Sequence, residues 1–73
     1  MSALWALDVQ RAGVNAFSCI IINARSETSA KASATRRLSA MRGVRNAYLT
    51  RLRPDGATIA QWRRVNGRWV ANL

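Results

Sequence analysis

The order of apolar and polar residues along the chain predicts five strands and one helix. Leu4–Gln10 alternates between apolar and polar side chains, which is the periodicity of a strand with one buried face. Asn15–Ala24 is rich in β-formers and contains a continuous apolar run. Because such runs are typical of strands that are buried on both faces, we expect a central strand there. Three further strands are expected, at Asn46–Arg53, Ala57–Val65 and Arg68–Leu73.

A single helix is expected between the second and third of these strands. Ser26 offers a hydroxyl group that can cap a helix, and Glu27 places a negative charge in the first turn. Apolar residues then recur at helical spacing over about 14 residues. They form one narrow stripe of Ala30, Ala34, Leu38 and Met41. Gly43 is expected to terminate the helix.

The pair Asn66-Gly67 is the strongest hairpin signal in the chain, because it suits the positive φ angles of a type I′ turn. A turn of this length fixes the register of the two strands that it joins. The expected opposed pairs are Val65 with Arg68, Arg64 with Trp69, Arg63 with Val70, and Trp62 with Ala71. Opposed residues share a face. The two tryptophans and one arginine therefore fall on one face, and aliphatic residues with two arginines fall on the other.

Together these elements predict one α+β domain over residues 1–73, in which a five-stranded antiparallel sheet packs on one helix in the order ββαβββ. One helix can cover only one face of the sheet. The uncovered face should show either tryptophans with one arginine, or aliphatic side chains with two arginines. We interpret this face as an interaction surface, since exposed apolar side chains mixed with arginine are typical of binding sites. The alternatives are a core that wraps around the sheet and a homodimer that hides the face.

Arginine dominates the charged residues. Twelve residues are basic, eleven of them Arg, and three are acidic, which gives a formal net charge of +9. From residue 35 onward, nine arginines face only Asp55. Such a field favours negatively charged partners, and Arg binds phosphates and carboxylates through two parallel hydrogen bonds. An arginine excess can also reflect the base composition of a genome. The residues expected to bind a partner or phosphate are Lys31, Arg36, Arg37, Arg63, Arg64, Arg68 and Trp69.

The side chains that catalysis needs are nearly absent. The chain has no histidine, and Asp8, Glu27 and Asp55 fall in a strand, a helix start and a turn, so no two acids are paired for acid–base work. Cys19 lies in an apolar strand with no histidine to activate it, so we expect it in the core. One cysteine without histidine also excludes the usual zinc sites, and the four glycines are isolated. We expect no enzyme activity, no metal and no cofactor.

The sequence also predicts a cytoplasmic location. A single cysteine fits a reducing compartment. The first residues lack the basic and apolar regions of a signal peptide. No apolar run approaches the roughly 20 residues that a membrane span needs. We therefore expect no membrane partner.

Three segments carry a resemblance to a known family. Asn23–Lys31, Tyr48–Arg53 and above all the hairpin Val65–Val70 resemble the ninth family of type I-F anti-CRISPR proteins, which are small phage-encoded proteins. The resemblance covers about residues 20–71, and the first hairpin matches in pattern only. It implies the same element order, with a five-stranded antiparallel sheet on one helix.

The resemblance implies a specific partner. Proteins of that family bind the backbone subunits of the crRNA-guided surveillance complex (Cascade) in the host cytoplasm and keep target DNA from pairing with the guide. They are also associated with non-specific duplex DNA binding by the inhibited complex, which uses basic helix residues of the inhibitor. Lys31 matches such a helix position, whereas Arg36 and Arg37 lie on the same helix without matching residue by residue.

The leading expectation is thus a phage inhibitor of a type I surveillance complex, present as a monomer or a homodimer. A second hypothesis is a small basic protein that binds nucleic acid directly through its arginines. A third is a structural phage protein, such as a capsid-decorating subunit, whose basic surface meets an acidic shell.

Overall fold

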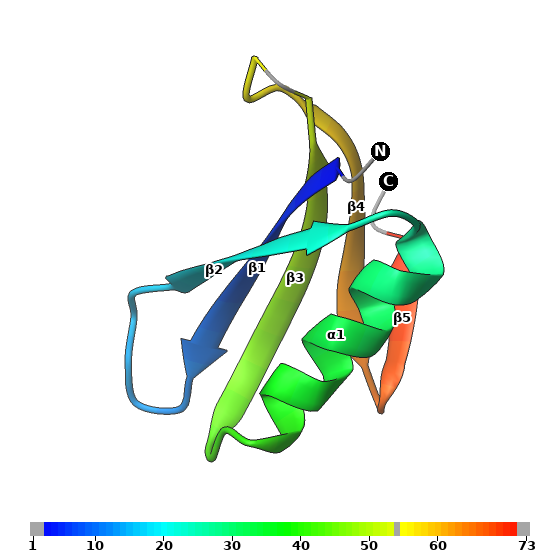
Figure 1. Cartoon of the computed structure of the whole chain (residues 1–73). Coiled ribbons are helices and arrows are strands. Elements are labelled where there is room, and N and C mark those ends of the chain that lie inside the picture. Colours follow the sequence, from blue (N-terminus) through cyan, green and yellow to red (C-terminus); the bar gives the residue numbers. More distant parts are fainter. Residues whose placement is uncertain (1–2, 54, 72–73) are drawn as a thin grey trace.

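The computed structural model describes residues 3–53 and 55–71 and confirms the predicted ββαβββ order (Figure 1). The elements are β1 (Ala3–Arg11), β2 (Ser18–Ala24), α1 (Glu27–Ser39), β3 (Val44–Leu52), β4 (Thr58–Val65) and β5 (Arg68–Ala71). The strands form one antiparallel sheet in the order β2-β1-β3-β4-β5, and α1 packs on one of its faces. The last two residues of the expected fifth strand, Asn72 and Leu73, lie outside the described residues.

The prediction of a central strand at Asn15–Ala24 is wrong. This segment supplies β2, which begins at Ser18 and forms one edge of the sheet, paired to β1. Ile20, Ile22 and Ala24 face the core, whereas the alternate side chains of Cys19, Ile21 and Asn23 do not, and 54% of Ile21 is exposed. The continuous apolar run therefore predicts a strand correctly. It does not predict the position of this strand in the sheet, because one face of the sheet is left uncovered.

The helix begins as predicted and ends earlier than predicted. The Ser26 hydroxyl accepts a hydrogen bond from the Ser29 amide at 3.1 Å, and Glu27 lies in the first turn. The helix ends at Ser39 with Ala40 as its C-cap. Gly43, with a φ of 69°, instead provides the left-handed backbone that leads into β3. Within the described residues, α1 is the only helix, and it is too short and too polar to span a bilayer.

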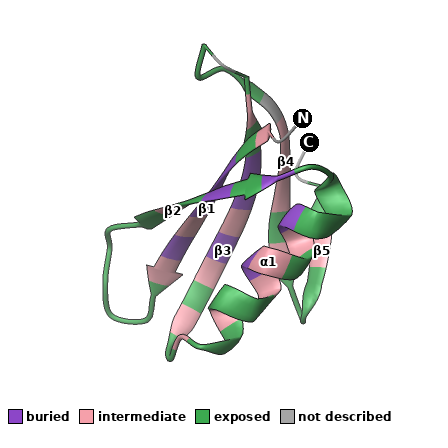
Figure 2. Ribbon diagram, viewed as in Figure 1, coloured by how far each residue is buried: buried purple, intermediate pink, exposed green. Residues whose placement is uncertain are grey.

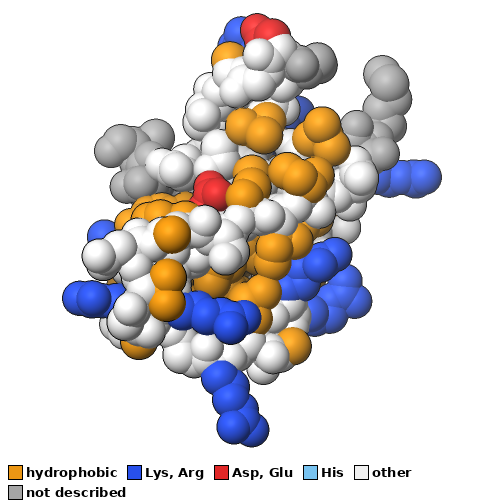
Figure 3. All heavy atoms as spheres, turned by 90° about the vertical axis from the view of Figure 1, so that its left-hand side faces the viewer, with side chains coloured by type: hydrophobic (Ala, Val, Ile, Leu, Met, Phe, Trp, Pro, Cys, Tyr) orange, Lys and Arg blue, Asp and Glu red, His pale blue; other side chains and the backbone are white. Residues whose placement is uncertain are grey.

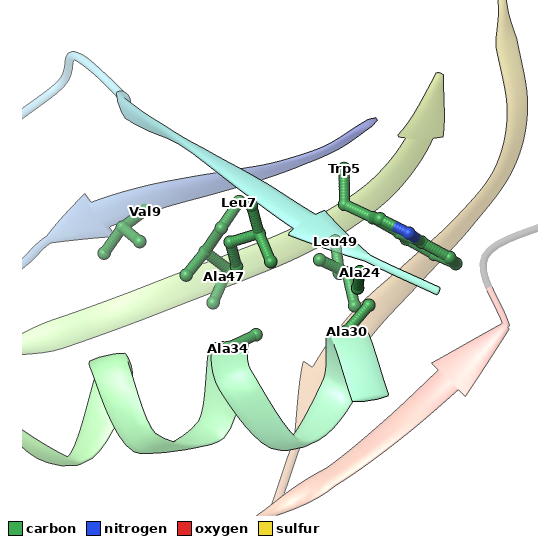
Figure 4. Close-up of a cluster of buried hydrophobic side chains, with 9 residues drawn as sticks. Trp5, Leu7, Val9, Ala24, Ala30, Ala34, Ala47 and Leu49 are labelled. Carbon is green, nitrogen blue, oxygen red and sulfur yellow. The ribbon is translucent and has the colours of Figure 1, made fainter. Parts of the chain in front are cut away.

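The core lies between α1 and the sheet (Figure 4). Its buried side chains come from β1, β2, β3 and α1: Trp5, Leu7, Val9, Ile22, Ala24, Ala30, Ala34, Ala47 and Leu49. The two alanines of α1 point toward the sheet, and their small size lets the helix approach it closely. Leu38 and Met41 are partly buried against the same core, so the predicted apolar stripe is confirmed.

The last hairpin has the predicted turn and register. Asn66 and Gly67 both have positive φ angles, 48° and 78°, as a type I′ turn requires. All four predicted pairs, from Val65 with Arg68 to Trp62 with Ala71, are present. Trp62 and Trp69 pack against the core, so α1 covers the tryptophan face. Of the two arrangements left open by the sequence, the uncovered face therefore carries aliphatic side chains and two arginines.

Candidate functional site

The uncovered face of the sheet, which we call the open sheet face, combines exposed aliphatic and basic side chains. Strand alternation places four large aliphatic residues on it, and they are strongly exposed: Leu4 (47%), Ile21 (54%), Val65 (38%) and Val70 (49%). Arg63 and Arg68 are exposed on the same face. Figure 2 shows buried positions on the sheet and on the inner side of α1, with exposed residues around them. Figure 3 shows hydrophobic side chains close together on the side of the molecule that faces the viewer, with Lys and Arg side chains beside and between them.

A row of five side chains crosses the open sheet face from one edge to the other. Cross-strand pairing aligns Cys19 with Asp8, Asp8 with Tyr48, Tyr48 with Arg63, and Arg63 with Val70. An acidic side chain thus lies beside an aromatic ring, and the ring lies beside an arginine. The row brings together chemically different residues from all five strands.

A shallow hollow lies beside the middle of this row. It has a volume of about 340 Å³ and is lined by Asp8, Phe17, Tyr48 and Gln61. Phe17 comes from the loop between β1 and β2 and packs on Tyr48, with the ring centroids 5.8 Å apart and the rings tilted by 54°. The Gln61 side chain donates a hydrogen bond to the Thr50 hydroxyl at 3.4 Å. The hollow therefore has two aromatic walls and one carboxylate.

Cys19 is exposed on this face, so the prediction that it lies in the core is wrong. The cause is the edge position of β2, which leaves alternate side chains of the strand without cover. Partial desolvation raises the pKa of the Cys19 thiol, and the Asp8 carboxylate raises this pKa further through its charge and a hydrogen bond from the thiol. The thiolate, which is the reactive form, is therefore disfavoured.

Alkylation of Cys19 by iodoacetamide is expected to become fast only at a higher pH than alkylation of a free cysteine. Asp8→Asn removes the negative charge that disfavours the thiolate, so it should move the pH–rate profile to lower pH. Mass spectrometry of the alkylated protein at a series of pH values measures both profiles. Asp55→Asn, which removes the same charge in the loop between β3 and β4, is the control. Identical profiles for wild type and Asp8→Asn would contradict the inference that Asp8 raises the pKa of the Cys19 thiol.

The predicted basic residues of α1 divide into two kinds. Lys31 is held in place: its Nζ lies 3.0 Å from Glu27 Oε2 and 4.7 Å from the centroid of the Trp62 ring. Arg36 and Arg37 are exposed on the outer side of the helix and border a second hollow with Ser33 and Ala40. Of the predicted helix residues, these two arginines are the ones whose charge is open to a partner.

The four predicted site residues of the last hairpin lie on opposite faces of the sheet. Arg63 and Arg68 lie on the open sheet face, whereas Arg64 and Trp69 lie beneath α1. The Thr35 hydroxyl of the helix accepts hydrogen bonds from Arg64 Nη1 at 3.2 Å and from Trp69 Nε1 at 3.1 Å. The Arg64 guanidinium also lies 5.3 Å from the centroid of the Trp69 ring. These two side chains therefore attach the last hairpin to the helix.

Thr35→Val is expected to destabilise the protein by about 1–3 kcal/mol. Valine keeps the shape of threonine but leaves the two part-buried donors, Trp69 Nε1 and Arg64 Nη1, without their acceptor. Urea unfolding followed by tryptophan fluorescence measures the loss. Ser39→Ala is the matched control, because it also removes a hydroxyl from α1, and this exposed hydroxyl donates its hydrogen bond to the Thr35 carbonyl of the same helix. Equal stabilities for the two variants would show that Thr35 does not hold the hairpin.

Sequence reasoning missed the residues that line the hollow. The alternation in the first strand already placed Asp8 on the face opposite Trp5, but no local signal pairs Asp8 with Tyr48 or brings Phe17 over that ring. Within residues 3–53 and 55–71, no group of three or more His, Cys, Asp or Glu side chains could hold a metal ion. No family model, curated protein or solved structure matches the chain.

Proposed function

We propose that the protein is an anti-CRISPR inhibitor that binds a type I crRNA-guided surveillance complex and keeps it from binding target DNA. The element order ββαβββ and the five-stranded antiparallel sheet agree with what the sequence resemblance implies. The observation that carries the proposal is the open sheet face, which suits a protein partner better than it suits solvent.

The aliphatic side chains of the open sheet face favour burial by a partner. Leu4, Ile21, Val65 and Val70 leave about two-fifths to one-half of their surface exposed. Covering each of them would contribute about 1 kcal/mol. They lie on a face formed by five hydrogen-bonded strands, which loses little conformational freedom when a partner binds.

The charges on this face restrict the type of partner surface. The channel that holds target DNA in such complexes is positively charged, so a chain of net charge +9 does not enter it as a mimic of DNA. Arg63 and Arg68 are instead suited to carboxylates on a protein surface, with which arginine forms paired hydrogen bonds. The chain would then exclude DNA by its bulk, while the exposed arginines of α1 remain outside the contact.

Size-exclusion chromatography of the purified chain with purified type I complexes of several subtypes tests this proposal. We expect the chain to co-elute with at least one complex at a fixed stoichiometry. Light scattering of the chain alone shows in the same experiment whether a homodimer hides the open sheet face. If the chain co-elutes with none of the complexes, or forms a stable dimer through this face, the proposal is lost.

Direct nucleic-acid binding is the second candidate, and the distribution of arginines favours it. Within the described residues, the only ion pair joins Lys31 and Glu27, so no arginine is neutralised by an acid. Ten of the eleven arginines are exposed, and Arg64 is the exception. Such side chains can hold phosphates without reading sequence.

A gel shift of a DNA duplex by the chain alone, at two salt concentrations, separates the two candidates. A nucleic-acid-binding protein should bind the free duplex tightly at low salt, and its affinity should fall by orders of magnitude as the salt concentration rises. An inhibitor directed at a protein should bind the free duplex weakly at both concentrations.

A further inference from the structure

The open sheet face holds a carboxylate that the protein itself leaves without a cation. Asp8 is partly buried in the central part of the sheet and accepts a hydrogen bond from the Cys19 thiol. Within residues 3–53 and 55–71, no Lys or Arg nitrogen lies within ion-pair distance of it, although the chain has twelve basic residues. A solitary negative charge on the face of so basic a protein attracts an external cation.

The two rings beside Asp8 add a second source of attraction for a cation. Phe17 and Tyr48 line the same hollow as Asp8 and lie in a tilted contact with each other. The faces of aromatic rings attract guanidinium and ammonium groups, with a contribution of about 0.5–1 kcal/mol at exposed sites. The rings also offer apolar contact to the methylene groups that carry such a cation. A simple metal ion has no such groups and would leave the rings unused.

The size and surroundings of the hollow point to a side chain of another protein. Its volume of about 340 Å³ can hold the end of an arginine or lysine side chain. Arg63 follows Tyr48 in the same cross-strand row and is exposed, so it repels an isolated cation that approaches from that side. A partner that presents its cation next to carboxylates therefore binds more tightly than the cation alone, because Arg63 can contact those carboxylates.

We propose that Asp8, Phe17 and Tyr48 form a binding site for an arginine or lysine side chain of a partner protein, with Gln61 closing the hollow. The partner surface that fits has one basic side chain at its centre and acidic residues around it. This is the opposite of the acidic or phosphate-rich partner that the net charge alone suggests. The inference goes beyond the proposed function, since it holds for any protein partner that has such a surface.

Titration of the isotope-labelled protein with Nα-acetyl-arginine methylamide, followed by NMR, tests this site without any partner protein. The matched neutral probe is Nα-acetyl-citrulline methylamide, which has the same shape without the charge. We expect saturable shifts of the Phe17 and Tyr48 ring signals with the arginine probe and none with the citrulline probe. A third titration with Nα-acetyl-lysine methylamide shows which of the two cations the hollow prefers.

Variants connect the response to the proposed residues. Asp8→Asn is expected to weaken binding of the arginine probe by about three- to five-fold. Asp55→Asn, with the same change in net charge far from the hollow, should leave it unchanged. Phe17→Leu alters an exposed loop side chain, so it should fold normally and also weaken binding by about two- to five-fold. Equal responses to the charged and neutral probes, or equal affinity in wild type, Asp8→Asn and Phe17→Leu, would overturn the inference.

Discussion

Leu49→Ala is expected to leave a large fraction of the molecules unfolded. Leu49 is fully buried, with 0% of its surface exposed, and lies on the central strand β3 beneath α1. The core cluster to which it belongs includes four alanines, whose single methyl groups are fixed to the backbone and cannot move to fill a cavity. Truncating a buried leucine costs about 2–5 kcal/mol. A single core in a chain of this size rarely supplies more than about 3–5 kcal/mol of net stability, so the loss is comparable to the whole.

Urea unfolding monitored by circular dichroism measures the effect of Leu49→Ala. The control is Leu4→Ala, which makes the same chemical change on β1 at a side chain that is 47% exposed. We expect this control to cost about 1 kcal/mol or less. If both variants were as stable as the wild type, the core would not lie where the structure places it.

The double variant Arg63→Glu, Arg68→Glu is expected to weaken binding to a surveillance complex by about ten- to a hundred-fold. This expectation rests on the proposed function. Both side chains lie on the open sheet face, and reversing their charge would place carboxylates opposite the acidic surface that we expect there. Because both are exposed and have no ion-pair partner among the described residues, the fold should tolerate the change.

The matched control for this double variant is Arg36→Glu, Arg37→Glu. It makes the same change in net charge on the outer side of α1. We expect it to bind the complex nearly as tightly as the wild type. Lys31 and Arg64 are left unchanged, because both have structural partners and their loss would alter the fold as well as the charge. Loss of binding in the helix variant alone would place the interface on α1 instead.

Local signals in the sequence predicted the elements and one register. The Asn66-Gly67 turn fixes the pairing of its flanking strands through the backbone angles of two adjacent residues, so all four pairs could be predicted. The Ser26 cap and the stripe that contains Ala30 and Ala34 depend on neighbours within a few residues, and they too were predicted. Features of this kind need no knowledge of the rest of the chain.

The order of the strands could not be predicted in the same way. β2 lies at the edge of the sheet because β3, which is distant in the sequence, pairs with the other side of β1. With β2 at the edge and one face of the sheet uncovered, Cys19 and Ile21 become exposed although their local pattern is that of a core strand. The apolar run predicts a strand correctly, but the burial of its side chains depends on the pairing of strands that are distant in the sequence.

The candidate site could be predicted only in part, because contacts between distant segments also decide which of its residues are exposed. Charge and hairpin register predict seven site residues. Whether an arginine of the hairpin is exposed to solvent or bonded to Thr35 depends on which face of the sheet α1 covers. That choice places Arg64 and Trp69 under the helix and leaves Arg63 and Arg68 on the open sheet face. The pairing of Asp8 with Tyr48 joins residues of β1 and β3, and no turn between them fixes it.

Binding of a fluorescent target duplex by a type I surveillance complex, measured with increasing amounts of the chain, tests the central claim most directly. The proposed function predicts that target binding is lost when the chain reaches the stoichiometry of its complex, and that Arg63→Glu, Arg68→Glu restores it. The Arg36→Glu, Arg37→Glu variant should still prevent the complex from binding the target duplex. Unchanged target binding at a large excess of wild-type chain, in every type I subtype that is tried, would contradict the account.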